Sequence, residues 1–418
     1  MAKKTLGEVA DYINGRAFKP DEWEDDGLPI IRIQNLTGST DVCNRTTKTY
    51  EEKYLVVDGD LLFAWSASLG AHIWHGENGW LNQHIFKVIP HEGTDKLYLY
   101  YYLLHVVDQL YAKTHGSGMV HITLKPFKNT EIYIPPLSEQ HRIVTRIESL
   151  FAKLDEAKEK SQAVVDGFEL RKSAILHKAF TGELTERWRK KHGVGLDSWE
   201  VKSLKEVASL QTGLMKGKCY EEETVFHPYL RVANVQDGFL DLTEIKNIEV
   251  SVSNVERYLL KQGDVLFTEG GDYDKLGRGT VWEGEIPNCL HQNHIFVVRP
   301  HKDILNPYFL SFQAGSKYGK KYFLSCSKQT TNLASINSTQ LKQFPVKLPT
   351  LPEQIEIISK ISHLLKLESH AKETAEAVLD QIDTMKKAIL ARAFRGELGT
   401  NDPTEEWAGE YIQTKICL

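Results

Sequence analysis

The chain has 418 residues, 41% of them apolar, and a formal net charge of −5 at pH 7. This length and apolar content suit two or three domains with buried cores. The longest apolar run, residues 97–107, is too short to span a bilayer, and residues 1–5 lead into polar sequence. We therefore expect a cytoplasmic protein without membrane contact. The five cysteines lie far apart and lack a paired motif, which argues against a disulfide frame or a zinc site.

Short pieces of strand-like sequence occur early in the chain and recur after residue 200. They alternate β-branched and apolar residues between Gly, Pro, Asn and Asp, as strands and turns do. Residues 58–63 match 262–267, and residues 82–86 match 292–296. Between these matched pieces the two regions differ freely. A shared scaffold with unlike loops predicts two sites of one kind that recognise different targets.

Each region is followed by one copy of a longer repeat, and the two copies align without a gap. Residues 135–184 align with 349–398 at 22 identical positions, so the chain consists of two related halves. Each copy has a Leu-x-Glu-Gln start next to proline, a Phe-x-Gly-Glu-Leu end and an apolar stripe with a period near 3.5. This period predicts a coiled-coil helix of about 40 residues, roughly 60 Å long, in each copy.

The apolar stripes also suggest what the helices contact. One stripe alone would fit a helix that packs on its own domain, whereas two copies of equal length favour packing against each other. Arg171 is off the pattern. The residues expected in the coiled-coil interface are Ile147, Leu150, Leu154, Val164, Phe168, Ile175, Ile361, Leu364, Val378, Ile382, Met385 and Ile389.

The order of segments resembles a known family over essentially the whole chain. A variable region, a helix that opens at Leu-Ser-Glu-Gln, a second variable region and a helix that opens at Leu-Pro-Glu-Gln resemble the specificity (S) subunit of type I restriction-modification systems. The resemblance implies a subunit without catalysis of its own. Each variable region would be a target-recognition domain that binds one half of a bipartite site in double-stranded DNA. The helices would set the spacer and dock two methyltransferase (M) subunits and, through them, two restriction/translocase (R) subunits, which would supply adenine methylation and ATP-dependent cleavage.

Two alternatives are a stand-alone DNA methyltransferase or nuclease and a coiled-coil scaffold that binds only proteins. An adenine methyltransferase needs a glycine-rich cofactor turn and an Asn-Pro-Pro-aromatic loop, but residues 306–309 lack the second proline. Two stretches end in Gly-Lys, residues 213–218 and 315–320, but neither has the glycine spacing of a phosphate loop. The pairs His72 with His75 and His291 with His294 lack a third ligand at a recognisable spacing. We expect no cofactor and no metal, and the unlike loops count against a scaffold.

Charge is distributed unevenly along the chain. A net charge of −5 is not the basic footprint of an autonomous DNA binder, so part of the affinity must come from elsewhere. Residues 109–130 and 304–352 contain no Asp or Glu but several lysines. A charge run is often only a solvated face, yet its recurrence before both helices indicates contact with phosphates and bases. The candidates are Lys113, His115, His121 and Lys125 in the first stretch and Lys320, Lys321, Lys328, Gln329 and Asn332 in the second.

Further candidates follow from the hydrogen-bonding code of the bases, because Arg reads guanine, and Asn or Gln reads adenine, through paired bonds. The candidates are two matched triplets, Asn82, Gln83 and His84 in the first half and Gln292, Asn293 and His294 in the second. The polarity usual in hairpin turns explains these residues equally well. Residues 269–279 are rich in glycine and follow a predicted strand. Their acidic side chains would repel nucleotide phosphates, so we expect a base-reading loop. Its candidates are Gly271, Asp272, Lys275 and Arg278.

These segments together predict an α+β fold. Two tandem mixed α/β target-recognition domains would be separated by two long antiparallel helices that form a coiled coil, with pseudo-two-fold symmetry. The expected segments are 1–136 and 191–350 for the recognition domains, 137–190 and 351–399 for the helices, and 400–418 for a C-terminal tail.

Overall fold

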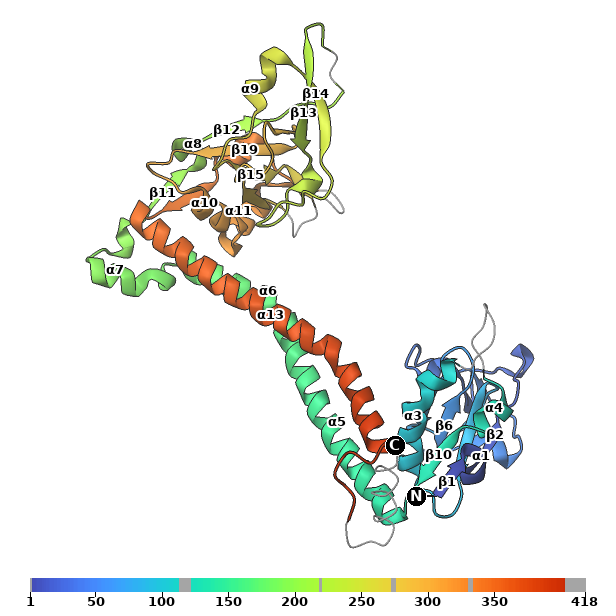
Figure 1. The fold of residues 1–418 in the computed structure, drawn as a ribbon. Helices are drawn as coiled ribbons and strands as arrows, with labels where there is room; N and C mark the ends of the chain where they lie inside the picture. The colour runs from blue at the N-terminus through green and yellow to red at the C-terminus, as the bar shows by residue number, and fades with distance from the viewer. Residues whose placement is uncertain (1, 113–121, 218–219, 272–275, 330–333, 403–418) are drawn as a thin grey trace. The chain divides into compact units, whose positions relative to one another are not determined.

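The computed structural model describes residues 2–112, 122–217, 220–271, 276–329 and 334–402 (Figure 1). The chain forms two compact units. The first unit comprises Met1–Gln162 together with Glu376–Leu418, and the second comprises Ala163–Ala375. Each unit therefore contains one α+β domain, the beginning of one long helix and the end of the other.

The first unit contains mixed strands and helices. Its strands are β1 (Ala2–Thr5), β2 (Ala10–Asn14), β3 (Leu28–Ile31), β4 (Arg45–Thr46), β5 (Leu55–Val56), β6 (Leu61–Ala64), β7 (Gly70–Ile73), β8 (Gly79–Leu81), β9 (Ile85–Pro90) and β10 (Glu131–Ile134). Its helices are α1 (Leu6–Val9), α2 (Ile33–Leu36), α3 (Lys96–Ala112), α4 (Leu124–Lys128) and most of α5 (Leu137–Asp166), with 3-10 turns η1 (Pro20–Glu22) and η2 (Glu52–Tyr54).

The second unit has the same kind of content. Its strands are β11 (Glu200–Ser203), β12 (Ala208–Thr212), β13 (Thr224–Leu230), β14 (Lys246–Ser251), β15 (Val265–Thr268), β16 (Gly270–Gly271), β17 (Gly279–Val281), β18 (Leu290–His291), β19 (Ile295–Pro300), β20 (Lys328–Gln329), β21 (Ala334–Ser335) and β22 (Pro345–Leu348). Its helices are α6 (Phe168–Phe180), α7 (Glu186–His192), α8 (Leu204–Val207), α9 (Val255–Tyr258), α10 (Pro307–Gly315), α11 (Lys317–Cys326), α12 (Ser338–Lys342) and the start of α13 (Leu351–Phe394). Its 3-10 turns are η3 (Glu183–Thr185), η4 (Leu196–Ser198), η5 (Val232–Asn234) and η6 (Val252–Asn254).

The two units share one sheet topology. The central sheet has the order β2-β9-β6-β7 in the first unit and β12-β19-β15-β17 in the second. A separate antiparallel pair, β1 with β10 or β11 with β22, brings both ends of each domain together. A parallel pair, β3 with β8 or β13 with β18, completes the match. The repeated pattern confirms the expected α+β fold built from two related halves.

Each domain core buries the ends of both long helices. In the first unit, α3 packs on the central sheet, and Ile143 and Ile147 of α5 join that core together with Leu390 of α13. In the second, α10 and α11 take the place of α3, with Phe180 of α6 and Ile361 of α13 in the core. The ends of the apolar stripes thus pack on the domains, as a helix packing on its own domain would.

The long helices run antiparallel within each unit. In the first unit, the Lys386 Nζ donates to Asp155 Oδ1 at 2.6 Å. In the second, the Lys372 ammonium lies 5.1 Å from the centre of the Phe168 ring, and Arg171 Nε donates to Glu368 Oε2 at 2.6 Å. Residue numbers therefore rise along one helix as they fall along the other.

Most of the expected interface residues are buried or half-buried, but Met385 is exposed. Ile147, Ile361 and Ile382 are buried, whereas the Met385 side chain is 42% exposed. Lys386 occupies the inward position next to it, with its ammonium 5.1 Å from the centre of the Phe151 ring. On this turn of α13 a lysine covers an aromatic ring, an arrangement that an apolar pattern does not reveal, and the interface role of Met385 stays a prediction.

The first long helix is interrupted, although a continuous helix was expected. α5 ends at Asp166, and α6 begins at Phe168 after Gly167. The Arg171 guanidinium folds over this glycine, and its Nη2 donates to the carbonyl oxygen of Val164 at 2.7 Å. A Cβ at Gly167 would lie 2.3 Å from Arg171 Nη1. Glycine also weakens a helix interior by about 1 kcal/mol, and α13, with Gln381 at the matching position, stays unbroken.

The Glu-Gln pair at the start of each long helix is fully buried. Gln140 Nε2 donates to the carbonyls of Gly93 and Pro135, and its Oε1 accepts from Asp95 N. Gln354 repeats these three bonds with Ile304, Pro349 and Asn306, each at 2.9 Å. The glutamine therefore ties each helix start to the loop that precedes α3 or α10.

The glutamates that precede these glutamines are paired differently. Glu139 accepts from Arg142, and from Thr400 Oγ1 at 2.5 Å. Glu353 accepts from Arg189 Nη1 and Thr185 Oγ1, both at 2.7 Å, and from the indole N–H of Trp199 at 2.9 Å. Arg189 is itself 6% exposed, so this ion pair is buried.

We predict that Arg189→Ala destabilises the second unit strongly. Removal of one partner from a buried ion pair leaves an uncompensated charge and costs about 3–5 kcal/mol. Denaturant unfolding of the full chain measures this change. Arg187→Ala, two residues away on an exposed position of α7, is the matched control and should cost less than about 0.5 kcal/mol. Equal stability of both variants would contradict a supporting role for the buried pair.

Candidate nucleic-acid interface

Two chain crossings position the polar residues that were matched between the halves. Gly213 follows β12 and lies close to the end of β18. A Cβ at Gly213 would be 2.2 Å from the His291 carbonyl oxygen. Gly15 makes the same approach to Asn82 in the first unit, with a Cβ distance of 2.0 Å. Only glycine fits such contacts. A main-chain hydrogen bond joins the two segments at each crossing. Asn293 N donates to Leu214 O at 2.8 Å, and Gln83 N donates to Arg16 O at 2.7 Å.

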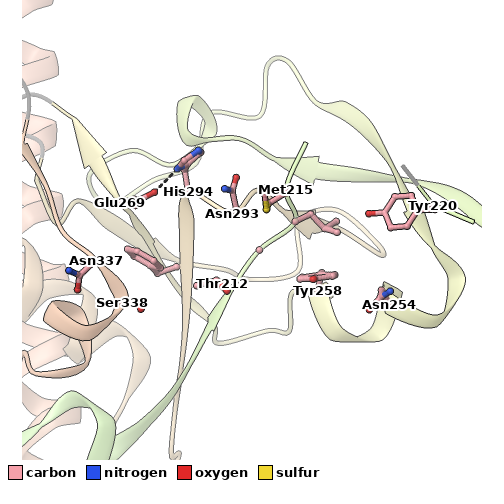
Figure 2. A pocket seen from close by; sticks show the side chains of 13 residues that line it. Thr212, Met215, Tyr220, Asn254, Tyr258, Glu269, Asn293, His294, Asn337 and Ser338 are labelled. Atoms are coloured by element: carbon pink, nitrogen blue, oxygen red, sulfur yellow. Dashed lines mark hydrogen bonds and ion pairs between the residues drawn. The ribbon is translucent and has the colours of Figure 1, made fainter. Parts of the chain in front are cut away.

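A pocket of about 530 Å³ opens beside the crossing in the second unit. Its walls come from loops at the ends of β12, β15 and β18, from α9 and from the start of α12, and Figure 2 shows the side chains that line it. The polar lining residues are Thr212, Tyr220, Asn254, Tyr258, Glu269, Asn293, His294, Asn337 and Ser338. Loops at one edge of a rigid sheet are a common location for binding residues.

Glu269 and His294 form a polar contact at this pocket (Figure 2). His294 Nδ1 lies 2.5 Å from Glu269 Oε2. Because a carboxylate only accepts hydrogen bonds, Nδ1 is the donor. The main chain of Glu269 is also held on both sides, because its N–H donates to His294 O at 2.9 Å and its carbonyl accepts from Ile336 N at 2.8 Å.

The first unit has the same main-chain arrangement with a different side chain. Trp65 N donates to His84 O at 3.0 Å, and Ile122 N donates to Trp65 O at 3.1 Å. The indole N–H of Trp65 donates to Asn14 Oδ1 at 2.9 Å, and its ring packs against His84 with 4.8 Å between centroids. One backbone frame thus presents an acid in the second unit and an aromatic ring in the first.

The matched polar triplets do not all face one site. Asn293 and His294 line the pocket, whereas the main chain of Gln292 forms a β-bridge with that of Leu214 at the crossing. In the first unit Asn82 forms the corresponding bridge with Arg16, Gln83 is exposed, and His84 packs on the tryptophan. The main chain of one residue in each triplet therefore belongs to the chain crossing.

The glycine-rich stretch is described only in part. Gly271 lies in β16, which pairs with β21, while Asp272 and Lys275 lie outside the described residues. Arg278 is half-buried, and its Nη1 donates to Gln236 Oε1 at 3.1 Å. Gly271 and Arg278 are not among the residues that line the pocket, whereas Glu269 at the start of the stretch is.

The lysines of the acid-free stretches lie in several places. Lys320 and Lys321 of α11 line a groove of about 390 Å³ next to α6, where Lys320 Nζ is 3.9 Å from Asp237 Oδ2. Lys328 in β20 and Lys125 in α4 are exposed. Lys113, His115, His121 and Asn332 lie outside the described residues, as does the environment of the Gln329 side chain. The four described lysines, Lys125, Lys320, Lys321 and Lys328, thus do not line the pocket.

One histidine behind the pocket has a lowered pKa. His291 is fully buried, and burial lowers its pKa to about 4, so it is neutral near pH 7. Its Nδ1 lies 3.1 Å from the carbonyl oxygen of Tyr258, an acceptor that fixes the proton on Nδ1. Within the described parts of the chain, no three His, Cys, Asp or Glu side chains come together as a metal site would need.

The pocket can form hydrogen bonds of several kinds with a flat polar group such as a base edge. Asn293 offers a donor and an acceptor, Glu269 offers acceptors, and Asn337 uses Oδ1 to cap α12, which leaves its amide N–H groups as donors. Sequence analysis did not select Glu269, Trp65 or Asn337. For Glu269 and Trp65 the sequence did contain an indication, because the two residues align with each other two positions after the matched residues 58–63 and 262–267 and differ in side chain.

A duplicated α+β domain with unlike side chains at equivalent positions defines a class of two-site recognition proteins. Comparison with known proteins identifies the family. The profile of the type I restriction modification DNA specificity domain matches residues 1–165 and 197–378, so the chain belongs to that family.

Individual relatives cover almost the whole chain. The EcoBI specificity subunit of Escherichia coli is 26% identical, with 97% of this chain and 87% of that protein covered. The EcoKI specificity subunit of Escherichia coli K12 is also 26% identical, with 97% and 89% covered. The HsdS subunit from Thermoanaerobacter tengcongensis has a similar fold, with a TM-score of 0.64 and 20% identity over 95% of this chain and 97% of that one. None of the described helices is both long and apolar enough to cross a membrane.

Proposed function

We propose that this chain selects the DNA target of a type I restriction-modification complex in the cytoplasm. Each α+β domain binds one half of a bipartite sequence in double-stranded DNA. The observation that carries this function is the shared backbone frame with Glu269 in one domain and Trp65 in the other. Because main-chain bonds hold the frame, its side chains can differ between the domains and recognise different bases.

Within this proposal the chain itself does no chemistry. Two M subunits supply adenine methylation, and two R subunits joined through them supply ATP-dependent cleavage. The long helices dock the M subunits and set the spacer between the half-sites. Leu170 of α6 is 76% exposed and Leu367 of α13 is 53% exposed, so both helices present apolar side chains that a partner could cover.

The negative net charge supports a shared binding task. A chain with a charge of −5 gains little from nonspecific attraction to phosphates. Partner subunits that surround the duplex supply the missing basic surface. The full complex therefore binds DNA tightly, whereas the isolated chain does so weakly.

We predict that specificity is modular. Replacing residues 1–136 with the corresponding domain of a relative should change one half of the recognised sequence and leave the other half unchanged. The helix start can accept a foreign domain because Gln140 bonds only to main-chain atoms of that domain. Mapping of methylated sites by sequencing measures the outcome. Alteration of both half-sequences would contradict two independent sites.

Asn293 provides a test at a single position. Asn293→Ala removes a side chain from the pocket wall and should relax the preference at one base position of the second half-site by about 1–3 kcal/mol, if the amide makes a paired contact. Binding to duplexes that vary at each position measures this change. Gln292→Ala, at the chain crossing and not among the residues that line the pocket, is the control and should leave the base preference unchanged.

The lysines of α11 provide a test of phosphate contact. The double variant Lys320→Ala and Lys321→Ala should weaken binding to all DNA sequences alike and lower the salt slope by up to about one unit per lost contact. Affinity of the full complex at several salt concentrations measures it. Lys190→Ala, exposed and paired with Glu186 on α7, is the control. An unchanged slope in the double variant would place these lysines away from DNA.

A further inference from the structure

We propose that Glu269 is the residue through which the second domain recognises a cytosine in its half of the DNA site. This inference rests on the proposed function and extends it, because it assigns a base to one side chain of the pocket. It starts from a carboxylate at the wall of a pocket in a protein that binds an anionic duplex.

The Glu269 side chain is held in place before any ligand binds. Main-chain bonds to His294 and Ile336 fix its backbone, and the His294 imidazole holds Oε2. Oε1 has no donor among the residues that the structure describes. The Glu269 and His294 side chains are 36% and 53% exposed, so their contact adds little to folding stability. The imidazole N–H therefore occupies one carboxylate oxygen and leaves the other as an acceptor at the wall of the pocket.

A carboxylate can bind only one base edge without repulsion. In the major groove, guanine presents two acceptors and thymine presents one, so both repel a carboxylate. Adenine has an amino group, but its N7 acceptor lies next to it. Cytosine presents its N4 amino group without a neighbouring acceptor, and it is the base that Glu and Asp read. The fixed acceptor of Glu269 therefore selects cytosine.

The first domain provides an internal comparison. Trp65 occupies the same backbone frame, and its indole N–H already donates to Asn14. A tryptophan side chain has no acceptor, so the first domain does not recognise an amino group at this position. The cytosine preference should belong to the second half-site alone.

The test compares the full chain, assembled with its methyltransferase partners, in wild-type, Glu269→Gln and Glu269→Ala forms. Each complex selects from duplexes with randomised sequence, and sequencing gives the preferred half-sites. The wild type should require cytosine at one position of the second half-site. Glu269→Gln keeps the shape but adds a donor for adenine N7, so cytosine preference should fall by about 5- to 100-fold and adenine should be accepted. Glu269→Ala should remove the preference at that position.

Glu200→Gln, an exposed acid in β11 of the same unit, is the matched control and should select the wild-type sequence. Thermal unfolding of each complex shows whether the variants fold. A wild-type second half-site without cytosine, or an unchanged cytosine preference in Glu269→Gln and Glu269→Ala, would overturn the inference and leave bipartite recognition intact. Selection of no bipartite sequence by the wild type would contradict both the inference and the proposed function.

Discussion

The buried glutamine at the fourth position of each long helix is the constraint on which the rest of the structure depends. Gln140 and Gln354 each make three hydrogen bonds, all to main-chain atoms before the helix or in the loop that precedes α3 or α10. A buried amide that lost these bonds would cost about 1–3 kcal/mol for each unsatisfied group. The glutamine thus fixes where each helix leaves its domain, and it does so without requiring any particular side chain in that domain.

The same principle holds at the pocket. Glu269 and Trp65 sit between identical pairs of main-chain bonds, while glycines at the two chain crossings allow the segments to approach. Main-chain bonds tolerate side-chain change, whereas a packed core does not. A protein whose task is to recognise varied sequences benefits from this separation, because its binding residues can differ without loss of the fold.

Charge is used locally rather than in bulk. The chain is acidic overall, its α11 lysines share a groove with Asp237, and its pocket holds a carboxylate beside an imidazole. Such a surface discriminates between bases more than it attracts DNA, since attraction depends on the number of neutralised phosphates. Under the proposed function, specificity and affinity are assigned to different parts of the complex.

The sequence by itself determined the duplication, the long antiparallel helices and the family, because an ungapped repeat with a 3.5-residue period and Glu-Gln starts is a strong local pattern. It also placed Asn293 and His294 among the candidate base readers, and both line the pocket. Only the tertiary structure decided that α5 and α6 break at Gly167, since Arg171 reaches across to Val164 and Glu368, and that Lys386 rather than Met385 faces Phe151. It likewise brought Glu269 next to His294, 25 residues apart in the chain. Contacts of this kind depend on how strands and helices meet in space, and neither residue spacing nor composition contains that information.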